Sequence, residues 1–211
     1  GMVRNCLTLL QVHWYPQEVI QNAIVPVAGL GTRLLPATKS QPKEMLPVAR
    51  KPIEQYVAEE LVNNGLRQIL FVTGRGKSSI ENHFDHDPEL SRLLEQSNKQ
   101  ELLDALDFSE LKANYFYTRQ PFQKGLGDAI LCGESFAGQG PFVVALGDSI
   151  IGLHGQARLI ARMVELFETH HASAVVAVEE VPPEDVKHYG VIDPASIDGD
   201  VIRVANLIEK P

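Results

Sequence analysis

The feature that most constrains the fold is an unbroken apolar run that ends at two glycines. Residues 23–28 read AIVPVA, and Gly29 and Gly31 follow within GLGTR. A short apolar run bounded by glycine is typical of a buried strand in a parallel sheet, whose two faces are both covered. Open α/β sheets bind ligands at the carboxyl ends of such strands. The stretch therefore predicts an α/β fold with a ligand loop directly after this strand.

Apolar and polar runs alternate along the rest of the chain, as strands and helices do in α/β proteins. We expect further strands at residues 68–73, 115–120, 142–146, 174–178 and 201–208, and helices at residues 52–64, 88–107, 128–136 and 157–170. The helix over 88–107 is expected to break near Ser97. No repeat, low-complexity linker or shift in composition marks a domain boundary. The pattern predicts one domain with a largely parallel central sheet over residues 23–211, preceded by an extension, residues 1–22, of unknown role.

Composition excludes several classes of protein. The formal net charge of −8 argues against non-specific nucleic-acid binding, which needs a broadly basic face. No apolar run approaches the roughly 20 residues that a membrane span requires, and the apolar residues 7–10 are too few for a signal peptide. Cys6 and Cys132 have no disulfide-framework spacing, which favours free thiols in a reducing compartment. We therefore expect a cytoplasmic protein without nucleic-acid or membrane partners, and a homo-oligomer is left open.

Positive charge gathers beside the glycine loop even though the chain is acidic. Residues 33–51 contain five basic side chains and a single acid, Glu44. Arg33 can hold a phosphate through two parallel hydrogen bonds, while Lys43 supplies a compact charge. Glycine lets backbone N–H groups approach phosphate oxygens closely. The cluster predicts a site for a small, locally held anion.

Two glycine motifs resemble phosphate-binding signatures but are incomplete. GLGTRL lacks the third glycine of the dinucleotide fingerprint, because position 34 is Leu34. GRGKS ends like a P-loop, but the required first glycine is replaced by Phe71. We interpret the second motif as a turn between a strand and a helix, in which Lys77 and Ser78 are expected to be solvated.

The stretch AGLGTRLLPATKSQPKEMLPV resembles the signature of the sugar-nucleotide pyrophosphorylases, which join a sugar 1-phosphate to a nucleoside triphosphate. Within that family, SSIENHFD, RQ with KGLGDA, and IEKP resemble the bacterial UTP–glucose-1-phosphate uridylyltransferases, or UDP-glucose pyrophosphorylases. The thymidylyltransferase branch resembles the chain mainly at the first motif. The resemblance covers about residues 20–211. It implies a Rossmann-like, three-layer α/β/α nucleotidyltransferase domain with a mixed, mostly parallel sheet.

The resemblance also implies roles for individual residues. Arg33 would neutralise the leaving pyrophosphate, Lys43 would grip the nucleotide phosphates, and Asp148, at the end of the apolar run FVVAL, would bind Mg²⁺. Other matching positions would bind the nucleotide: Ala28, Gly29, Gly31, Thr32, Glu44, Gln120 and Gly125. The sugar phosphate would meet Gly190, Glu209 and Lys210, and Lys210 would also belong to the catalytic set.

The resemblance implies the reaction of UTP with glucose 1-phosphate to give UDP-glucose and pyrophosphate. Two alternatives stay open: a glucose-1-phosphate thymidylyltransferase, and a domain that binds UTP but is catalytically incomplete. The second arises because the related enzymes continue beyond the position of Pro211 into a segment that completes the sugar pocket. The domain is therefore expected to be truncated at its carboxyl end.

Overall fold

The computed structural model describes residues 6–10, 19–106, 111–150 and 158–209. The chain forms two compact units: unit 1 comprises Gly1–Gln17 and Arg158–Pro211, and unit 2 comprises Glu18–Ala157. The single domain expected over residues 23–211 stays a prediction. Among the described residues, no helix is both long enough and apolar enough to span a membrane.

Unit 2 is built on a four-stranded parallel sheet. Its strands are β2 (Asn22–Pro26), β5 (Gln68–Thr73), β6 (Asn114–Arg119) and β7 (Val143–Val144), in the order β6-β5-β2-β7. Every neighbouring pair is parallel, so the loops that follow these strands lie along one edge of the sheet. This carboxyl edge is where the sequence predicts the ligand loop.

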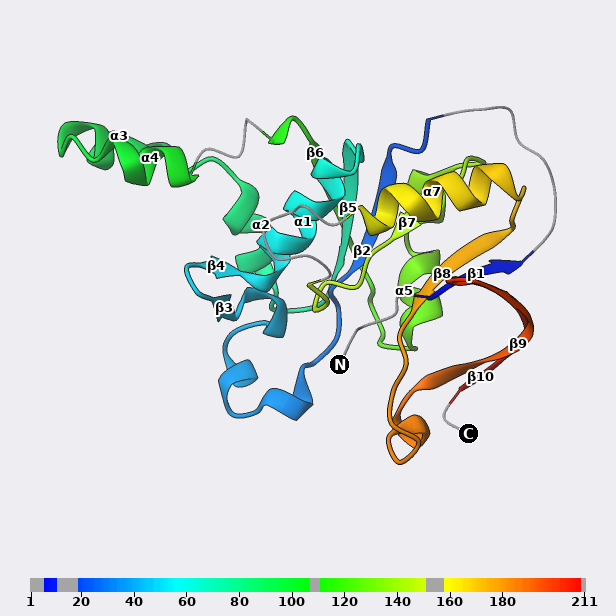
Figure 1. Cartoon of the computed structure of the whole chain (residues 1–211). Helices are drawn as coiled ribbons and strands as arrows, with labels where there is room; N and C mark the ends of the chain where they lie inside the picture. Colours follow the sequence, from blue (N-terminus) through cyan, green and yellow to red (C-terminus); the bar gives the residue numbers. More distant parts are fainter. Residues whose placement is uncertain (1–5, 11–18, 107–110, 151–157, 210–211) are drawn as a thin grey trace. The chain divides into compact units, whose positions relative to one another are not determined.

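Helices cover both faces of this sheet (Figure 1). Alternate residues of β5 point to opposite faces, as they do in any strand. Leu70 and Val72 belong to a buried cluster with residues of α5 (Leu126–Leu131) and α6 (Glu134–Ala137). Phe71 faces the other way and stacks on Phe84 of α2 (Ser78–Phe84), with ring centroids 5.2 Å apart. Helix α1 (Ile53–Asn63) lies on the side of α2. Unit 2 is thus a three-layer α/β/α arrangement.

A helical hairpin extends from unit 2 (Figure 1). It comprises α3 (Pro88–Gln96) and α4 (Gln100–Leu106), so the predicted break near Ser97 is confirmed. Helix α3 begins sharply because the Asp87 carboxylate accepts hydrogen bonds from the backbone N–H groups of Glu89 and Leu90. A short hairpin of β3 (Pro47–Val48) and β4 (Lys51–Pro52) leads into α1.

Unit 1 contains a second four-stranded sheet with a helix, α7 (Leu159–Thr169). Its strands are β8 (Ala174–Val178), β1 (Cys6–Leu10), β10 (Val201–Glu209) and β9 (Gly190–Asp198), in the order β8-β1-β10-β9. Strand β1 pairs parallel with β10 and antiparallel with β8. Part of the extension, to which the sequence assigned no role, therefore supplies a central strand of this sheet.

Two predicted elements differ from the structure. The strand expected over residues 142–146 pairs only at Val143–Val144, because the chain then turns into the loop that carries Asp148. The helix expected over residues 128–136 begins earlier, at Leu126, and is interrupted between Leu131 and Glu134. Gly133 allows close packing at this break because it has no side chain: a Cβ atom there would lie 2.6 Å from Ile24 Cδ1.

Candidate functional site

The glycine loop after β2 is held in a compact turn. Gly31 has a φ of +66°, and a Cβ atom at this position would lie 3.0 Å from Thr38 Cγ2. The Thr38 hydroxyl donates a hydrogen bond of 2.7 Å to the Gly31 carbonyl. Glycine is required here because both the positive φ and the close contact disfavour a side chain. Thr38 thereby ties the loop to the following turn.

Arg33 and Thr32 lie in the short helix η1 (Thr32–Leu34), directly after Gly31. Both side chains are exposed, and Arg33 makes no hydrogen bond or ion pair with another residue in the described part of the chain. An exposed guanidinium next to a tight glycine turn is available to an anion.

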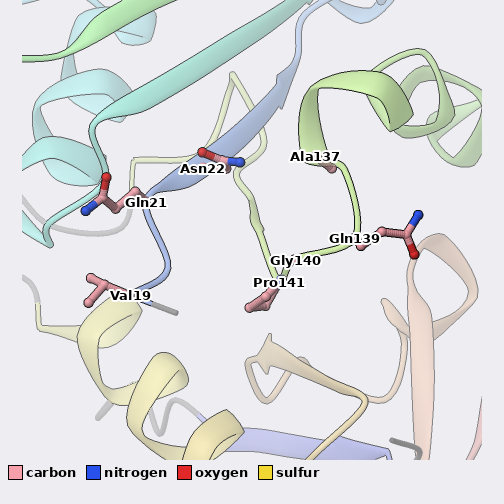
Figure 2. A pocket seen from close by; sticks show the side chains of 7 residues that line it. All are labelled: Val19, Gln21, Asn22, Ala137, Gln139, Gly140 and Pro141. Atoms are coloured by element: carbon pink, nitrogen blue, oxygen red, sulfur yellow. The ribbon is translucent and has the colours of Figure 1, made fainter. Parts of the chain in front are cut away.

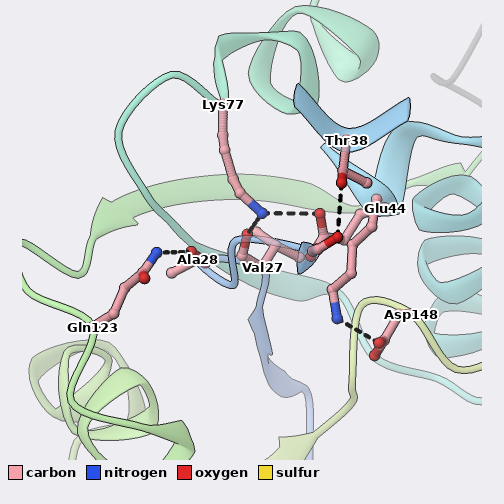
Figure 3. A network of polar contacts seen from close by, with 9 residues as sticks. Val27, Ala28, Thr38, Glu44, Lys77, Gln123 and Asp148 are labelled. Atoms are coloured by element: carbon pink, nitrogen blue, oxygen red, sulfur yellow. Dashed lines mark hydrogen bonds and ion pairs between the residues drawn. The ribbon is translucent and has the colours of Figure 1, made fainter. Parts of the chain in front are cut away.

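Lys43 and Asp148 meet at the carboxyl edge of the sheet, although they are 105 residues apart in the sequence (Figure 3). Lys43 lies in η3 (Lys43–Met45) and Asp148 in the loop after β7. The Lys43 ammonium donates to Asp148 Oδ2 at 2.5 Å, and the two side chains are 25% and 43% exposed. The structure thus brings together the predicted phosphate-binding cation and the predicted metal-binding carboxylate, both accessible to a ligand.

Lys77 is buried, so the prediction of a solvated side chain was wrong. Its ammonium donates to Glu44 Oε2 at 2.9 Å and to the carbonyl oxygen of Val27, and the Lys77 and Glu44 side chains are 8% and 1% exposed (Figure 3). Burial is tolerated because the charge is paired and hydrogen-bonded. Lys77 therefore links three segments: its own turn, the end of β2 and η3. Ser78 is exposed, as expected.

Glu54, in the first turn of α1, is fully buried behind the site. Neither of its carboxyl oxygens has a hydrogen-bond partner among the described residues. Burial, with a further contribution from the negative charge of Glu44, raises the pKa of Glu54 well above its ordinary value. Sequence reasoning missed Glu54, because an acid in the first turn of a helix usually only complements the helix dipole.

Gly147 allows the Asp148 loop to approach Glu54. A Cβ atom at Gly147 would lie 2.4 Å from Val27 Cγ1 and 2.8 Å from Glu54 Oε2. Only a glycine fits between these atoms without displacing them. The sequence signals this close approach only through Gly147 itself, which lies between a predicted strand and Asp148, the candidate metal ligand.

Gln120 follows β6 and is buried. Its side-chain nitrogen donates to Asp128 Oδ2 at 2.7 Å and to the Gly125 carbonyl at 3.2 Å. Gln123, which sequence reasoning missed, donates from its amide to the Ala28 carbonyl at 2.8 Å (Figure 3). The segments after β2 and β6, which carry the predicted base-binding residues, therefore lie at the same edge of the sheet, and the Gln123 side chain joins the two segments.

The predicted sugar-phosphate residues lie in unit 1. Gly190 begins β9 and Glu209 ends β10, and the two positions are paired in the antiparallel register. Lys210 lies outside the described residues. The structure thus places Gly190 and Glu209 beside each other, and their role in binding sugar phosphate stays a prediction.

A pocket of about 350 Å³ lies at the opposite end of β2 from the glycine loop (Figure 2). It is lined by Val19, Gln21, Asn22, Ala137, Gln139, Gly140 and Pro141. It contains none of the predicted site residues and no charged side chain, so it is not the anion site.

Comparisons with known proteins show which family the chain resembles. Residues 22–211 match the nucleotidyl transferase family. A Methanocaldococcus jannaschii protein, provisionally named a UTP–glucose-1-phosphate uridylyltransferase, is 51% identical over 193 residues, which are 92% of this chain and 66% of that protein. The Bacillus subtilis UTP–glucose-1-phosphate uridylyltransferase is 44% identical over 192 residues, 91% of this chain and 65% of that protein. The chain therefore spans slightly less than two thirds of the length of these curated relatives.

A solved structure is similar as well. The UTP-bound UGPase of Acinetobacter baumannii superimposes with a TM-score of 0.80 at 38% identity, covering 92% of this chain and 68% of that one. The predicted Rossmann-like α/β/α fold with a mostly parallel sheet is thus confirmed. From the match over residues 22–211 and the identity to these relatives, the chain belongs to the nucleotidyl transferase family.

Proposed function

We propose that this chain transfers a uridylyl group from UTP to glucose 1-phosphate, giving UDP-glucose and pyrophosphate. The observation that carries the proposal is the meeting of Lys43 and Asp148 beside the glycine loop. A cation for phosphate and a carboxylate for a metal ion are the two charges that a nucleotidyl transfer needs. The names of the relatives supply the choice of substrates.

The reaction needs no protein nucleophile. A phosphate oxygen of glucose 1-phosphate attacks the α-phosphorus of UTP, and the bond to the leaving pyrophosphate breaks in line with the attack. Both reactants are anions, so the protein must align them and neutralise the negative charge that they bring together. Arg33 and Lys43 would serve this purpose, with Arg33 on the pyrophosphate and Lys43 on the nucleotide phosphates.

Asp148 would hold Mg²⁺ beside the triphosphate. No group of three or more metal-ligating side chains exists among the residues that the structure describes, so the protein would contribute few ligands. Magnesium commonly binds through one or two carboxylates while phosphate oxygens and waters complete its coordination, which fits a single, 43% exposed carboxylate. When bound, the ion would offset phosphate charge.

The remaining site residues would recognise the two ends of the product. Backbone groups at Ala28 and Gly29, with Gln120 and Gly125, would receive the base, and Gly31 and Thr32 would line the phosphates. The Glu44 carboxylate already pairs with Lys77, so its contribution would come through η3 rather than by direct contact. Gly190, Glu209 and Lys210 would bind the sugar phosphate.

The test is to incubate the purified chain with UTP, glucose 1-phosphate and Mg²⁺, with dTTP in a parallel reaction, and to separate products by anion-exchange chromatography. UDP-glucose with an equal amount of pyrophosphate supports the proposal. Asp148→Ala should abolish product formation, whereas Glu95→Ala, which removes an exposed acid from α3, should not. Turnover that Asp148→Ala leaves unchanged would contradict the assignment.

A second candidate is a domain that binds UTP without turning it over. The chain spans 65% of the length of the Bacillus subtilis protein, so the activity of that whole protein is a proposal for this chain. This second candidate predicts UTP binding by calorimetry with no UDP-glucose formed. A preference for dTTP over UTP as the productive substrate would instead support a thymidylyltransferase.

A further inference from the structure

The side-chain amide of Gln120 is held by two groups that can only accept hydrogen bonds. Asp128 Oδ2 lies 2.7 Å from the amide nitrogen and the Gly125 carbonyl oxygen lies 3.2 Å from it. A carboxylate and a carbonyl have no hydrogen to donate, so the NH₂ end of the amide must face them. The hydrogen-bond network therefore fixes which way the amide points.

This leaves the amide oxygen as the end that a ligand can meet. Both N–H groups of the Gln120 amide are used, and no described residue donates to its Oε1. The Oε1 atom is also not among the buried side-chain atoms that lack a hydrogen-bond partner. The side chain itself is only 6% exposed, which restricts its freedom to turn over. Gln120 thus presents a fixed acceptor.

We infer that Asp128 is a specificity-determining positioning residue, which makes Gln120 offer an acceptor to the base and so selects uracil or thymine over cytosine. This inference rests on the proposed function, because it places the base of the nucleotide at Gln120. Asp128 acts through Gln120 and does not itself contact the base.

The chemistry of the bases gives the direction of the selection. Uracil and thymine carry a hydrogen on N3, which donates to an acceptor, whereas N3 of cytosine is itself an acceptor. Two acceptors facing each other leave a buried group unpaired, and such sites discriminate strongly. If Asp128 is removed, only the longer contact to the Gly125 carbonyl, at 3.2 Å, holds the amide in this orientation, so the amide is freer to turn over and donate to cytosine N3 instead. Thymine has the same hydrogen-bonding edge as uracil, so its relative affinity should not change.

The experiment measures the dissociation constants of UTP, CTP and dTTP for the full chain with Mg²⁺ by isothermal titration calorimetry. The variants are Asp128→Ala, which removes the acceptor, and Asp128→Asn, which keeps an acceptor oxygen. Glu134→Ala is the matched control, since Glu134 is an exposed acid in the first turn of the neighbouring helix α6. Each ratio of constants is taken within one variant, so partial unfolding of a variant cancels.

For Asp128→Ala we expect the preference for UTP over CTP to fall on the order of tenfold, the effect of one well-placed hydrogen bond. The ratio of UTP to dTTP should stay constant, and Asp128→Asn and Glu134→Ala should retain most of the preference for UTP over CTP. Equal weakening of all three nucleotides by Asp128→Ala would show a merely structural role and overturn the inference. A wild-type chain that binds none of them would overturn the proposed function instead.

Discussion

Replacing Lys77 by methionine tests the buried ion pair beside the glycine loop. The substitution keeps an unbranched, apolar stem but removes the ammonium that pairs with Glu44 at 2.9 Å and bonds to the Val27 carbonyl. Glu44 is 1% exposed, so its carboxylate cannot recover water when its partner is lost. Breaking a buried pair on one side costs about 3–5 kcal/mol, because an uncompensated charge stays behind. Typical domains have only about 5–15 kcal/mol of stability in total.

The assay is urea unfolding followed by far-ultraviolet circular dichroism. We expect Lys77→Met to lower the free energy of unfolding by about 3–5 kcal/mol. The matched control is Lys51→Met, which breaks a pair of similar length, 2.8 Å to Glu59, between side chains that are 44% and 20% exposed. An exposed pair contributes at most about 1 kcal/mol, since water and salt screen it.

A double variant separates charge from packing. Adding Glu44→Gln to Lys77→Met removes the unpaired charge and should restore part of the lost stability. The reasoning would be refuted if Lys77→Met cost no more than Lys51→Met. It would also fail if the double variant were less stable than Lys77→Met alone.

Three further predictions concern the same edge of the sheet. Because the pKa of Glu54 is raised in the folded protein, the protonated carboxyl stabilises the fold at pH values below its unfolded pKa, near 4.5. This stabilisation is lost as pH rises toward the folded pKa. The stability of Glu54→Gln should therefore rise relative to that of the wild type as pH increases above about 4.5, and a pH-independent difference in urea unfolding would contradict this. Gly147→Ala should cost about 1–3 kcal/mol through overpacking, whereas Gly127→Ala, whose Cβ would meet nothing within 4 Å, should not; equal thermal midpoints would refute the argument. Asp148→Ala should raise the activation free energy of nucleotidyl transfer by several kcal/mol, measured as kcat/KM, while circular dichroism stays unchanged, and retained metal-dependent turnover would exclude Asp148 as the ligand.

Much of the fold follows from local patterns. The run QILFVT was expected as a strand and forms β5 over the same residues, because its apolar, β-branched side chains suit a sheet covered on both faces. Strand β9 was missed, since GVIDPASID contains a proline and several polar residues. It is an edge strand whose partner, β10, supplies the pairing, and edge positions tolerate proline.

The candidate site, like the fold, could be predicted from the sequence only in part. Arg33, Lys43 and Asp148 were identified because charge beside a glycine loop or at a strand end is visible in the sequence. The burial of Lys77 could not be predicted from the sequence, since lysine is rarely buried and its partners lie 33 and 50 residues away in the chain. Glu54 likewise became notable only when the fold removed it from water. Local chemistry was thus predictable, and environments made by distant segments were not.

The 105-residue separation between Lys43 and Asp148 has a consequence for how the site forms during folding. The glycine loop and Lys43 belong to the first part of unit 2, but Asp148 reaches them only when β7, which precedes it in the chain, has paired with β2. Contacts of such long sequence separation form late, because closing a long loop costs entropy before the contact can stabilise it. A ligand that needs both side chains would bind only states in which β7 is paired with β2. Its binding would then favour these states over every state in which β7 is unpaired, so ligand saturation should report on the joining of β7 to β2 rather than on the folding of one loop.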